Sequence, residues 1–217
     1  MKVERWGRVP YREAWDRQLA VHHQVRAGAE DTLILVEHPP VLTLGANFHK
    51  DNLLLSPEEY AARGIEIHQT DRGGDVTYHG PKQLVIYPIF DLERYGRDLH
   101  RWLRGLEETM IVVCREFGLV AERFPPNTGA WVNGRKIAAI GIKVRRWVSL
   151  HGIALNCDLD LAVFDTFVPC GINGHGVTSM SEEVGRNVTI EDAAPVVVAA
   201  FAEVFGATPR ESAGGTG

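Results

Sequence analysis

The dipeptide Asn133-Gly134 lies between two apolar segments and constrains the fold more than any other feature of the chain. Asn-Gly favours the tight two-residue turn that joins neighbouring antiparallel strands. It therefore predicts a hairpin between residues 130–132 and a strand that runs from Lys136 to Val144. The next apolar stretch, residues 148–157, is expected to form a further strand. The centre of the fold is therefore expected to be a β-sheet.

Residues at helical spacing flank this strand region in the chain. The clearest helix is expected from Asp98 to Gly118, because its apolar residues recur on one face. Another is expected to begin after Thr189, whose hydroxyl suits an N-cap, and to end at Gly206. The sequence therefore predicts an α+β fold, a mixed β-sheet flanked by helices that cover one of its faces. The remaining expected elements are a strand at residues 3–6, a helix from Pro10, strands at residues 32–36 and 41–44, and a short capped helix after Ser56.

The length of 217 residues suits one domain with a sizeable core. We expect this domain to span residues 1–210, with a flexible polar tail at residues 211–217. The net charge of −5 argues against a general nucleic-acid-binding protein, and the apolar runs are too short to span a membrane. The N-terminus lacks the pattern of a secretory signal, and the 3 cysteines lack the spacing of a disulfide framework. These features predict a cytoplasmic protein.

Residues of several reactive types gather between Arg72 and Tyr87. Two adjacent glycines follow Arg72, and glycine lets a backbone approach a ligand closely. His79 is placed to donate a hydrogen bond to a developing oxyanion or to position a carbonyl group. A purely structural histidine is the alternative. The apolar strand that follows, residues 84–89, is expected to hold this loop in place.

Cys170 is the candidate nucleophile, because the proline and glycines around it are typical of a loop rather than of a core. An unperturbed thiol with a pKa near 8.5 is about 3% ionised at pH 7, and a cation that lowered the pKa to about 6.5 would raise this fraction to roughly 75%. Cys114 lies in an apolar helix and Cys157 at the end of a strand, so both are expected to be structural. A buried, inert thiol is the alternative for Cys170.

Lys136, just after the hairpin turn, is the expected cation beside the thiol, and it can also relay a proton when an amine attacks. Lys143, seven residues further along, is the competing candidate. Side chains alternate along a strand, so residues separated by an odd number face opposite sides unless a bulge intervenes. We therefore expect the two lysines not to share one site.

The segments 138–141 and 151–154 are rich in small and apolar residues, which leave room for a slender alkyl chain. Burying about six methylenes at ~0.8 kcal/mol each would contribute about 5 kcal/mol, which is enough to select an acyl chain by its length.

A metal site is disfavoured although the chain has 9 histidines. The pairs Cys170/His175 and His22/His23 lack the third and fourth ligands that zinc requires. Glycine motifs typical of nucleotide binding are absent as well, so no cofactor is expected.

The motifs along most of the chain resemble those of one enzyme family, the octanoyltransferases of lipoate biosynthesis, also called lipoate-protein ligase B. Several ordered segments at compatible spacing carry the resemblance, which makes it more specific than any single motif. The segments are residues 37–45 (Glu-His-Pro-Pro-Val-Leu-Thr-Leu-Gly), 72–87 (beginning Arg-Gly-Gly-Asp-Val-Thr-Tyr-His), 134–141 (Gly-Arg-Lys-Ile-Ala-Ala-Ile-Gly), 151–156 (His-Gly-Ile-Ala-Leu-Asn) and 169–172 (Pro-Cys-Gly-Ile).

The resemblance implies the fold shared with biotin-protein and lipoate-protein ligases, and a Cys170/Lys136 dyad that forms a thioester acyl-enzyme. It implies octanoyl-acyl carrier protein as the acyl donor, and no metal, cofactor, nucleic acid or membrane. The implied acceptors are lipoyl domains of 2-oxoacid dehydrogenase acyltransferase subunits and the glycine cleavage H protein. The implied substrate contacts are Arg72, Gly73, Gly74, Asp75, Val76, Thr77, Tyr78, His79, Ala139, Ile140, Gly141, Gly152, Ile153 and Ala154.

Other functions remain open on the residues alone. An ATP-dependent lipoate or biotin ligase of the same fold would use Lys136 on an acyl-adenylate and leave Cys170 incidental. A non-catalytic module that binds acyl carrier proteins would need neither residue. A papain-like thiol hydrolase is disfavoured, because no histidine–asparagine pair downstream of Cys170 supports it.

Overall fold

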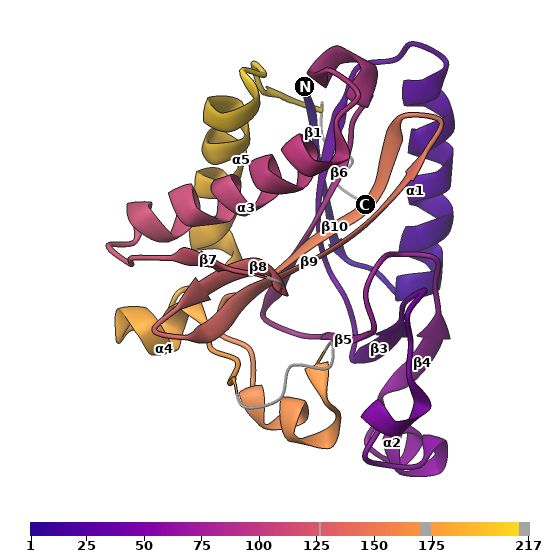
Figure 1. The fold of residues 1–217 in the computed structure, drawn as a ribbon, viewed down its shortest axis with the longest axis vertical. Coiled ribbons are helices and arrows are strands. Elements are labelled where there is room, and N and C mark those ends of the chain that lie inside the picture. The colour runs from indigo at the N-terminus through magenta and orange to yellow at the C-terminus, as the bar shows by residue number, and fades with distance from the viewer. Residues whose placement is uncertain (126, 170–174, 213–217) are drawn as a thin grey trace.

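A mixed sheet of 8 strands forms the centre of the fold (Figure 1). The computed structural model describes residues 1–125, 127–169 and 175–212. In spatial order the strands are β11 (Arg210–Glu211), β1 (Lys2–Arg8), β2 (Thr32–Glu37), β6 (Gln83–Ile89), β10 (Val148–Asn156), β9 (Arg135–Arg145), β8 (Asn127–Val132) and β7 (Glu122–Phe124). β1 runs parallel to β2 and β11, and the other neighbouring strands pair antiparallel. The predicted mixed sheet is confirmed.

A second sheet of 3 strands lies at one end of the large one, at the bottom of Figure 1. Its central strand β3 (Val41–Leu44) pairs in parallel with β4 (Glu66–Gln69) and antiparallel with β5 (Val76–His79). The helix α2 (Pro57–Ala62) precedes β4, and Ser56 and Glu59 form the expected capping box at its start.

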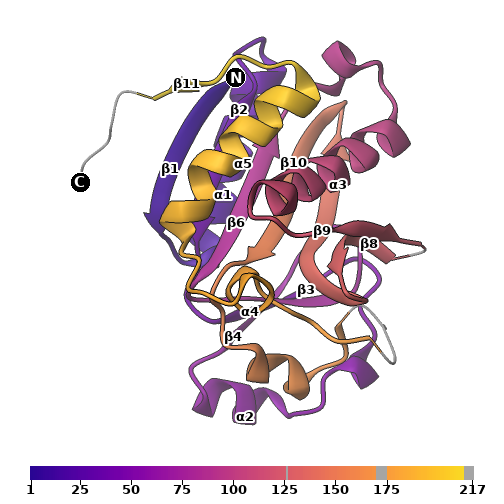
Figure 2. The ribbon, with the colours of Figure 1, turned by 90° about the vertical axis from the view of Figure 1, so that its left-hand side faces the viewer.

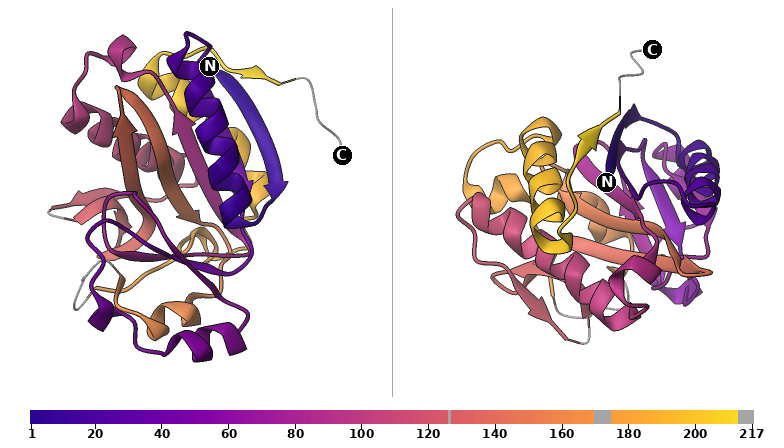
Figure 3. Two further views of the ribbon diagram at one scale, coloured as in Figure 1. Left: turned by 90° about the vertical axis from the view of Figure 1, so that its right-hand side faces the viewer. Right: turned by 90° about the horizontal axis from the view of Figure 1, so that it is seen from above.

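Helices cover both faces of the large sheet. Helix α1 (Tyr11–Arg26) lies on one face, and α3 (Leu99–Glu116) and α5 (Ile190–Phe205) lie on the other (Figures 2 and 3). In β2, Leu33 and Leu35 join the core cluster of α3 and α5, whereas Ile34 and Val36 join the cluster of α1. The expectation that one face is covered is therefore wrong. The unbroken apolar run at residues 33–36 is the pattern of a strand buried on both faces.

Local sequence signals mark the ends of the elements correctly. Asn133 and Gly134 have φ angles of 51° and 72°, the left-handed conformation that the two-residue hairpin turn needs. Thr189 forms a capping box at the start of α5, and Gly206 ends this helix with a φ of 64°. These expected boundaries are confirmed. Further helical segments in the described part of the chain include η1 (Lys50–Asn52), η2 (Leu92–Tyr95), η3 (Leu161–Thr166) and α4 (Met180–Val184).

The chain returns to the edge of the large sheet after α5. β11 pairs with β1, and the backbone nitrogen of Ser212 donates to the carbonyl of Val3 at 3.0 Å. Glu211 and Ser212, the first two residues of the expected flexible tail, are thus hydrogen-bonded to β1. The sheet therefore extends past the expected boundary at residue 210, and residues 213–217 lie outside the described part of the chain.

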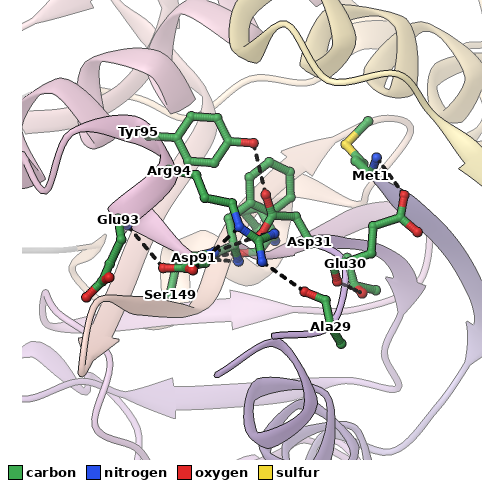
Figure 4. A network of polar contacts seen from close by, with 12 residues as sticks. Met1, Ala29, Glu30, Asp31, Asp91, Glu93, Arg94, Tyr95 and Ser149 are labelled. Atoms are coloured by element: carbon green, nitrogen blue, oxygen red, sulfur yellow. Dashed lines mark hydrogen bonds and ion pairs between the residues drawn. The ribbon is translucent and has the colours of Figure 1, made fainter. Parts of the chain in front are cut away.

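The buried carboxylate of Asp31 ties the start of β2 to the segment that follows β6 (Figure 4). One of its oxygens accepts hydrogen bonds from the backbone nitrogen of Asp91 at 2.9 Å and from the guanidinium of Arg94 at 3.0 Å. The other accepts from the hydroxyl of Tyr95 at 3.0 Å. Asp31 is 5% exposed, and these donors compensate the loss of water around its charge.

Replacing Asp31 with alanine should lower the free energy of unfolding by about 2–3 kcal/mol, because the Asp91 N–H and the Tyr95 hydroxyl lose their acceptor. The matched control is Asp16→Ala, whose carboxylate pairs with Arg12 on the exposed face of α1. The control should change stability by less than about 0.5 kcal/mol. Urea denaturation measures the free energy of unfolding of both variants. Equal changes would show that the Asp31 network contributes no more to stability than a surface ion pair.

Candidate active site

A cavity of about 510 Å³ is lined by residues of both sheets and by side chains of α1 and α3. Its volume lies in the range of small-molecule sites, roughly 300–1,000 Å³. Segments that are far apart in the sequence meet here. The expected site residues that line it are Arg72, Gly73, Gly74, Thr77, His79, Lys136, Ala139, Ile140, Gly141, Gly152, Ile153 and Ala154.

Three of the expected contact residues do not line this cavity. Val76 and Tyr78 alternate along β5 with residues that do line it, so their side chains point to the opposite face. There they are buried in the core cluster of the small sheet. The carboxylate of Asp75 is also buried, and it accepts hydrogen bonds from the backbone nitrogen of His49, at 3.2 Å, and from the amide of Asn52. The structure therefore uses these three side chains for packing and for anchoring a loop.

The side chain of Arg72 is 5% exposed and holds residues 72–75 against β3. Its Nε donates to the hydroxyl of Thr43 at 3.0 Å. Its terminal nitrogens donate to the carbonyls of Thr43, Gly73 and Asp75, the last two at 3.0 and 2.8 Å. A planar guanidinium with five N–H donors suits such a group of acceptors. Arg72 thus fixes the loop that borders the cavity.

Glycines in the cavity wall are required by backbone that passes close to them. A Cβ atom on Gly141 would lie 3.0 Å from the carbonyl oxygen of Gly73, and one on Gly152 would lie 2.1 Å from that of Ile86. Gly74 has a φ of 88°, which favours glycine. The lack of a side chain therefore follows from close backbone approach at Gly141 and Gly152, and from the backbone conformation at Gly74. Room for an alkyl chain then depends on the alanines of β9 and β10.

Lys136 is 7% exposed and lies at the wall of the cavity. Its Nζ is 5.0 Å from the ring centroid of Trp131, a distance typical of a cation–π contact. Its backbone nitrogen donates to the carbonyl of Gly176, and its carbonyl accepts from the nitrogen of Thr178, both at 2.9 Å. The segment that contains Gly176 and Thr178 is thus hydrogen-bonded to the backbone of Lys136 in β9.

Lys143 lines the same cavity, so the expectation that the two lysines lie apart is wrong. The reason is a bulge in β9. Trp131 of β8 lies opposite Lys136, whereas its neighbour Ala130 lies opposite Ala138, so one extra residue is inserted between the two pairs. Such an insertion reverses the alternation of side chains. Two lysines at an odd separation can therefore line one cavity.

Cys170 lies outside the described residues. The described chain on either side of it is hydrogen-bonded: the backbone nitrogen of Val168 donates to the carbonyl of Asn52 at 2.8 Å, and Gly176 pairs with Lys136. Cys114 and Cys157 are buried, and burial raises the pKa of each thiol to about 12. They are poor nucleophiles at neutral pH, which agrees with the structural role expected for them.

Two buried histidines stay uncharged near neutral pH. Burial lowers the pKa of His79 to about 3 and that of His38 to about 4. Their rings lie 5.8 Å apart, and the ring of Tyr11 stacks on that of His79 with a centroid distance of 6.0 Å. His38 Nδ1 donates to the carbonyl of Val9, so its Nε2 accepts from the hydroxyl of Tyr87, both at 2.7 Å.

A third histidine, His151, forms an ion-pair-like contact at the cavity wall. Its Nε2 lies 2.9 Å from a carboxylate oxygen of Asp71, and Arg145 donates to the other oxygen at 2.6 Å. These hydrogen bonds, that of His151 above all, hold the pKa of Asp71 well below its usual value. The Asp71 charge opposes the effect of burial on His151, but burial prevails and lowers the pKa of that ring.

Sequence reasoning missed several side chains of the cavity, including Tyr11, Asp71 and His151. Asp71 directly precedes Arg72, so widening that motif by one position would have included it. His151 already begins the segment 151–156, but it was not assigned a contact. Tyr11 carried no local signal, because it lies at the start of an ordinary surface helix. Leu99 and Leu103 of α3 also line the cavity, although their spacing indicated only a core-facing helix.

In residues 1–125, 127–169 and 175–212, no group of three or more His, Cys, Asp or Glu side chains could hold a metal ion. Over the same residues, none of the helices has the length and apolar character needed to cross a membrane.

The free energy of unfolding should depend on pH through His38. The unfolded chain binds a proton below pH 6.5, whereas the folded chain binds it only near pH 4, because burial lowers the His38 pKa. Above pH 6.5, protonation of this group therefore does not reduce the free energy of unfolding. As the pH falls from 6.5 towards 4, this group lowers the free energy of unfolding by about 1.4 kcal/mol per pH unit. His38→Gln should remove that part of the slope in urea titrations. His23→Gln, on the exposed side of α1, is the control, and an equal change in both variants would contradict the assignment.

Comparison with known sequences relates nearly the whole chain to one family. A model of the lipoyl protein ligase A/B catalytic domain matches residues 10–202. The octanoyltransferase of Chloroflexus aurantiacus is 48% identical over 218 aligned residues, which cover 98% of this chain and 97% of the relative. The octanoyltransferase of Gloeobacter violaceus is 48% identical over 202 residues, which cover 92% of this chain and 88% of the relative.

Solved structures share the fold at much lower identity. A lipoate-protein ligase A bound with ATP matches with a TM-score of 0.81 and 17% identity, covering 98% of this chain and 89% of that one. A biotin protein ligase from Aquifex aeolicus matches with a TM-score of 0.53 and 10% identity, covering 95% and 69%. The expected fold of biotin-protein and lipoate-protein ligases is confirmed. With relatives at 48% identity over nearly its whole length, the chain belongs to the octanoyltransferase family of acyltransferase enzymes.

Proposed function

We propose that this chain transfers an octanoyl group from octanoyl-acyl carrier protein to a lysine of a lipoyl domain in lipoate biosynthesis, with Cys170 as the residue that carries the acyl group. The observation that supports this most directly is the environment of Lys136. The lysine is buried at the cavity wall, and its backbone pairs with Gly176, six residues after Cys170. The ring of His175 contacts Trp131 at 5.9 Å, the same ring that faces the Lys136 ammonium group.

In the first step, the Cys170 thiolate attacks the carbonyl carbon of the octanoyl thioester. A C–S bond to Cys170 forms, the C–S bond to the carrier breaks, and the carrier thiolate takes a proton from Lys136. The ammonium group of Lys136 favours the reactive thiolate before the attack, because a nearby positive charge lowers a thiol pKa. The result is an acyl-enzyme.

In the second step, the amine of a lipoyl-domain lysine attacks the Cys170 thioester. A C–N bond forms, the C–S bond breaks, and Lys136 relays the amine proton to the departing sulfur. Conversion of a thioester to an amide is downhill, so the transfer needs no ATP. The proposed acceptors are lipoyl domains of 2-oxoacid dehydrogenase acyltransferase subunits and the glycine cleavage H protein, and the cytoplasm is the proposed location.

An ATP-dependent ligase is the second candidate, because a lipoate-protein ligase A bound with ATP shares the fold. A ligase forms an acyl-adenylate from free acid, so it exchanges labelled pyrophosphate into ATP in the presence of octanoate. We expect no such exchange with this protein. The octanoyltransferase relatives at 48% identity favour the transferase over the ligase.

Incubation with octanoyl-acyl carrier protein should add one octanoyl group to the peptide that contains Cys170. Peptide mass spectrometry identifies the modified residue, and Cys170→Ala should abolish the adduct. Cys114 and Cys157 serve as internal controls, because burial raises the pKa of both thiols. An adduct on either of them, or none on the wild type, would contradict the covalent mechanism.

Lys136→Ala should slow alkylation of Cys170 by iodoacetamide at pH 7 by about tenfold, because the thiolate fraction falls when the neighbouring cation is lost. Lys143→Ala is the matched control, since it removes a second lysine from the same cavity wall. Its alkylation rate should stay within about twofold of the wild type. A larger effect at Lys143 than at Lys136 would identify Lys143 as the cation beside the thiol.

A further inference from the structure

A continuous chain of buried hydrogen bonds connects His79 to the backbone of Lys136. His79 Nδ1 lies 2.8 Å from Gln83 Oε1, and Gln83 Nε2 donates to Asn156 Oδ1 at 3.0 Å. Asn156 Nδ2 donates to the carbonyl of Thr178 at 2.9 Å, and the Thr178 nitrogen donates to the carbonyl of Lys136 at the same distance. Gln83 is 2% and Asn156 4% exposed, so water does not compete for these bonds.

Two backbone carbonyls determine the direction of this chain. The carbonyls of Tyr78 and Thr178 can only accept, so the amide nitrogens of Gln83 and Asn156 must face them. The Gln83 oxygen must then face His79. An oxygen accepts, so His79 Nδ1 must carry the ring proton and donate it to Gln83. The tautomer of His79 therefore follows from the two backbone carbonyl oxygens, which can act only as acceptors.

The other ring nitrogen, Nε2, consequently carries a lone pair. His79 lines the cavity, and its Nε2 has no hydrogen-bond partner among the residues that the structure describes. Stacking on Tyr11 and the edge contact with His38 restrict the ring orientation. Burial lowers the pKa of the ring to about 3, so the lone pair remains unprotonated near neutral pH.

We propose that His79 Nε2 accepts a hydrogen bond from the attacking lysine amine, and that Gln83 and Asn156 are positioning residues that set the tautomer of His79. This inference rests on the proposed transfer to a lysine. The thioester offers only acceptors, so a lone pair cannot stabilise its developing oxyanion. The incoming amine has N–H groups to donate. The initial expectation that His79 donates to an oxyanion therefore does not suit the tautomer that Gln83 imposes.

His79 orients the nucleophile in this scheme and takes no proton. The amine nitrogen directs its lone pair at the acyl carbon while one N–H points to His79 Nε2. The bond changes are those of the second step: C–N forms, C–S breaks, and the amine proton goes to sulfur through Lys136. A hydrogen bond that fixes the nucleophile accelerates the reaction by orientation.

The experiment compares the two half-reactions in single turnover. Acylation is followed by release of the carrier thiol, and transfer by mixing isolated octanoyl-enzyme with a lipoyl domain. His79→Asn keeps a donor to Gln83 but has no atom at the position of Nε2, so it should slow transfer about tenfold more than it slows acylation. His79→Gln places an amide oxygen near the Nε2 position and should restore most of the transfer rate. Equal slowing of both half-reactions, or no difference between the variants, would overturn the assignment to the amine.

Nuclear magnetic resonance of the wild-type protein tests the tautomer without a variant. Long-range ¹H–¹⁵N correlations of the histidine rings should show the His79 proton on Nδ1. Gln83→Leu should remove this preference and slow transfer more than acylation, whereas Gln24→Leu on the exposed side of α1 should change neither. A proton on Nε2 in the wild type would refute the inference and leave the acyl-enzyme mechanism standing. Failure of the wild type to form an acyl-enzyme would instead refute the proposed function.

Discussion

The cavity depends on the hydrogen bonds of the Arg72 guanidinium, because they fix the loop that connects the small sheet to the large one. The guanidinium bonds to the hydroxyl and carbonyl of Thr43 in β3 and to the carbonyl of Gly73. The nitrogen of Gly73 donates in turn to the carbonyl of Ile142 in β9 at 2.8 Å. A buried cation without such acceptors would be strongly unfavourable, so the loop keeps the conformation that supplies them. The same loop then presents its glycines along β9.

Much of the fold could be predicted from local sequence signals. The Asn133-Gly134 turn, the Thr189 cap and the Gly206 end each depend on the conformational preference of one or two residues, so they are legible in the chain. The covering of both faces of the large sheet could not be predicted from such local signals, because it depends on where helices that are distant in the chain pack. An unbroken apolar run at residues 33–36 was the available sign.

The candidate site could be predicted as a set of segments but not as a set of side chains. A motif lists every residue in a row, whereas a strand sends alternate side chains to opposite faces, which is why Val76 and Tyr78 lie in the core cluster and not at the cavity. Tyr11 reaches the cavity through tertiary packing alone. The orientation of Gln83 and Asn156 depends on carbonyls separated by 100 positions in the chain, Tyr78 and Thr178, so no local pattern could reveal it.

The bulge in β9 has a consequence for the gene as well as for the protein. Trp131 and Ala130 are adjacent, but their partners Lys136 and Ala138 are separated by Ile137, so the strand carries a phase shift of one residue. A substitution in β9 alters one side chain. Loss of a single codon at the bulge would instead restore regular alternation and exchange the faces of every residue on one side of it. The number of residues in this strand is therefore as constrained as their identity, because it determines which face of the sheet each side chain, including both lysines, occupies.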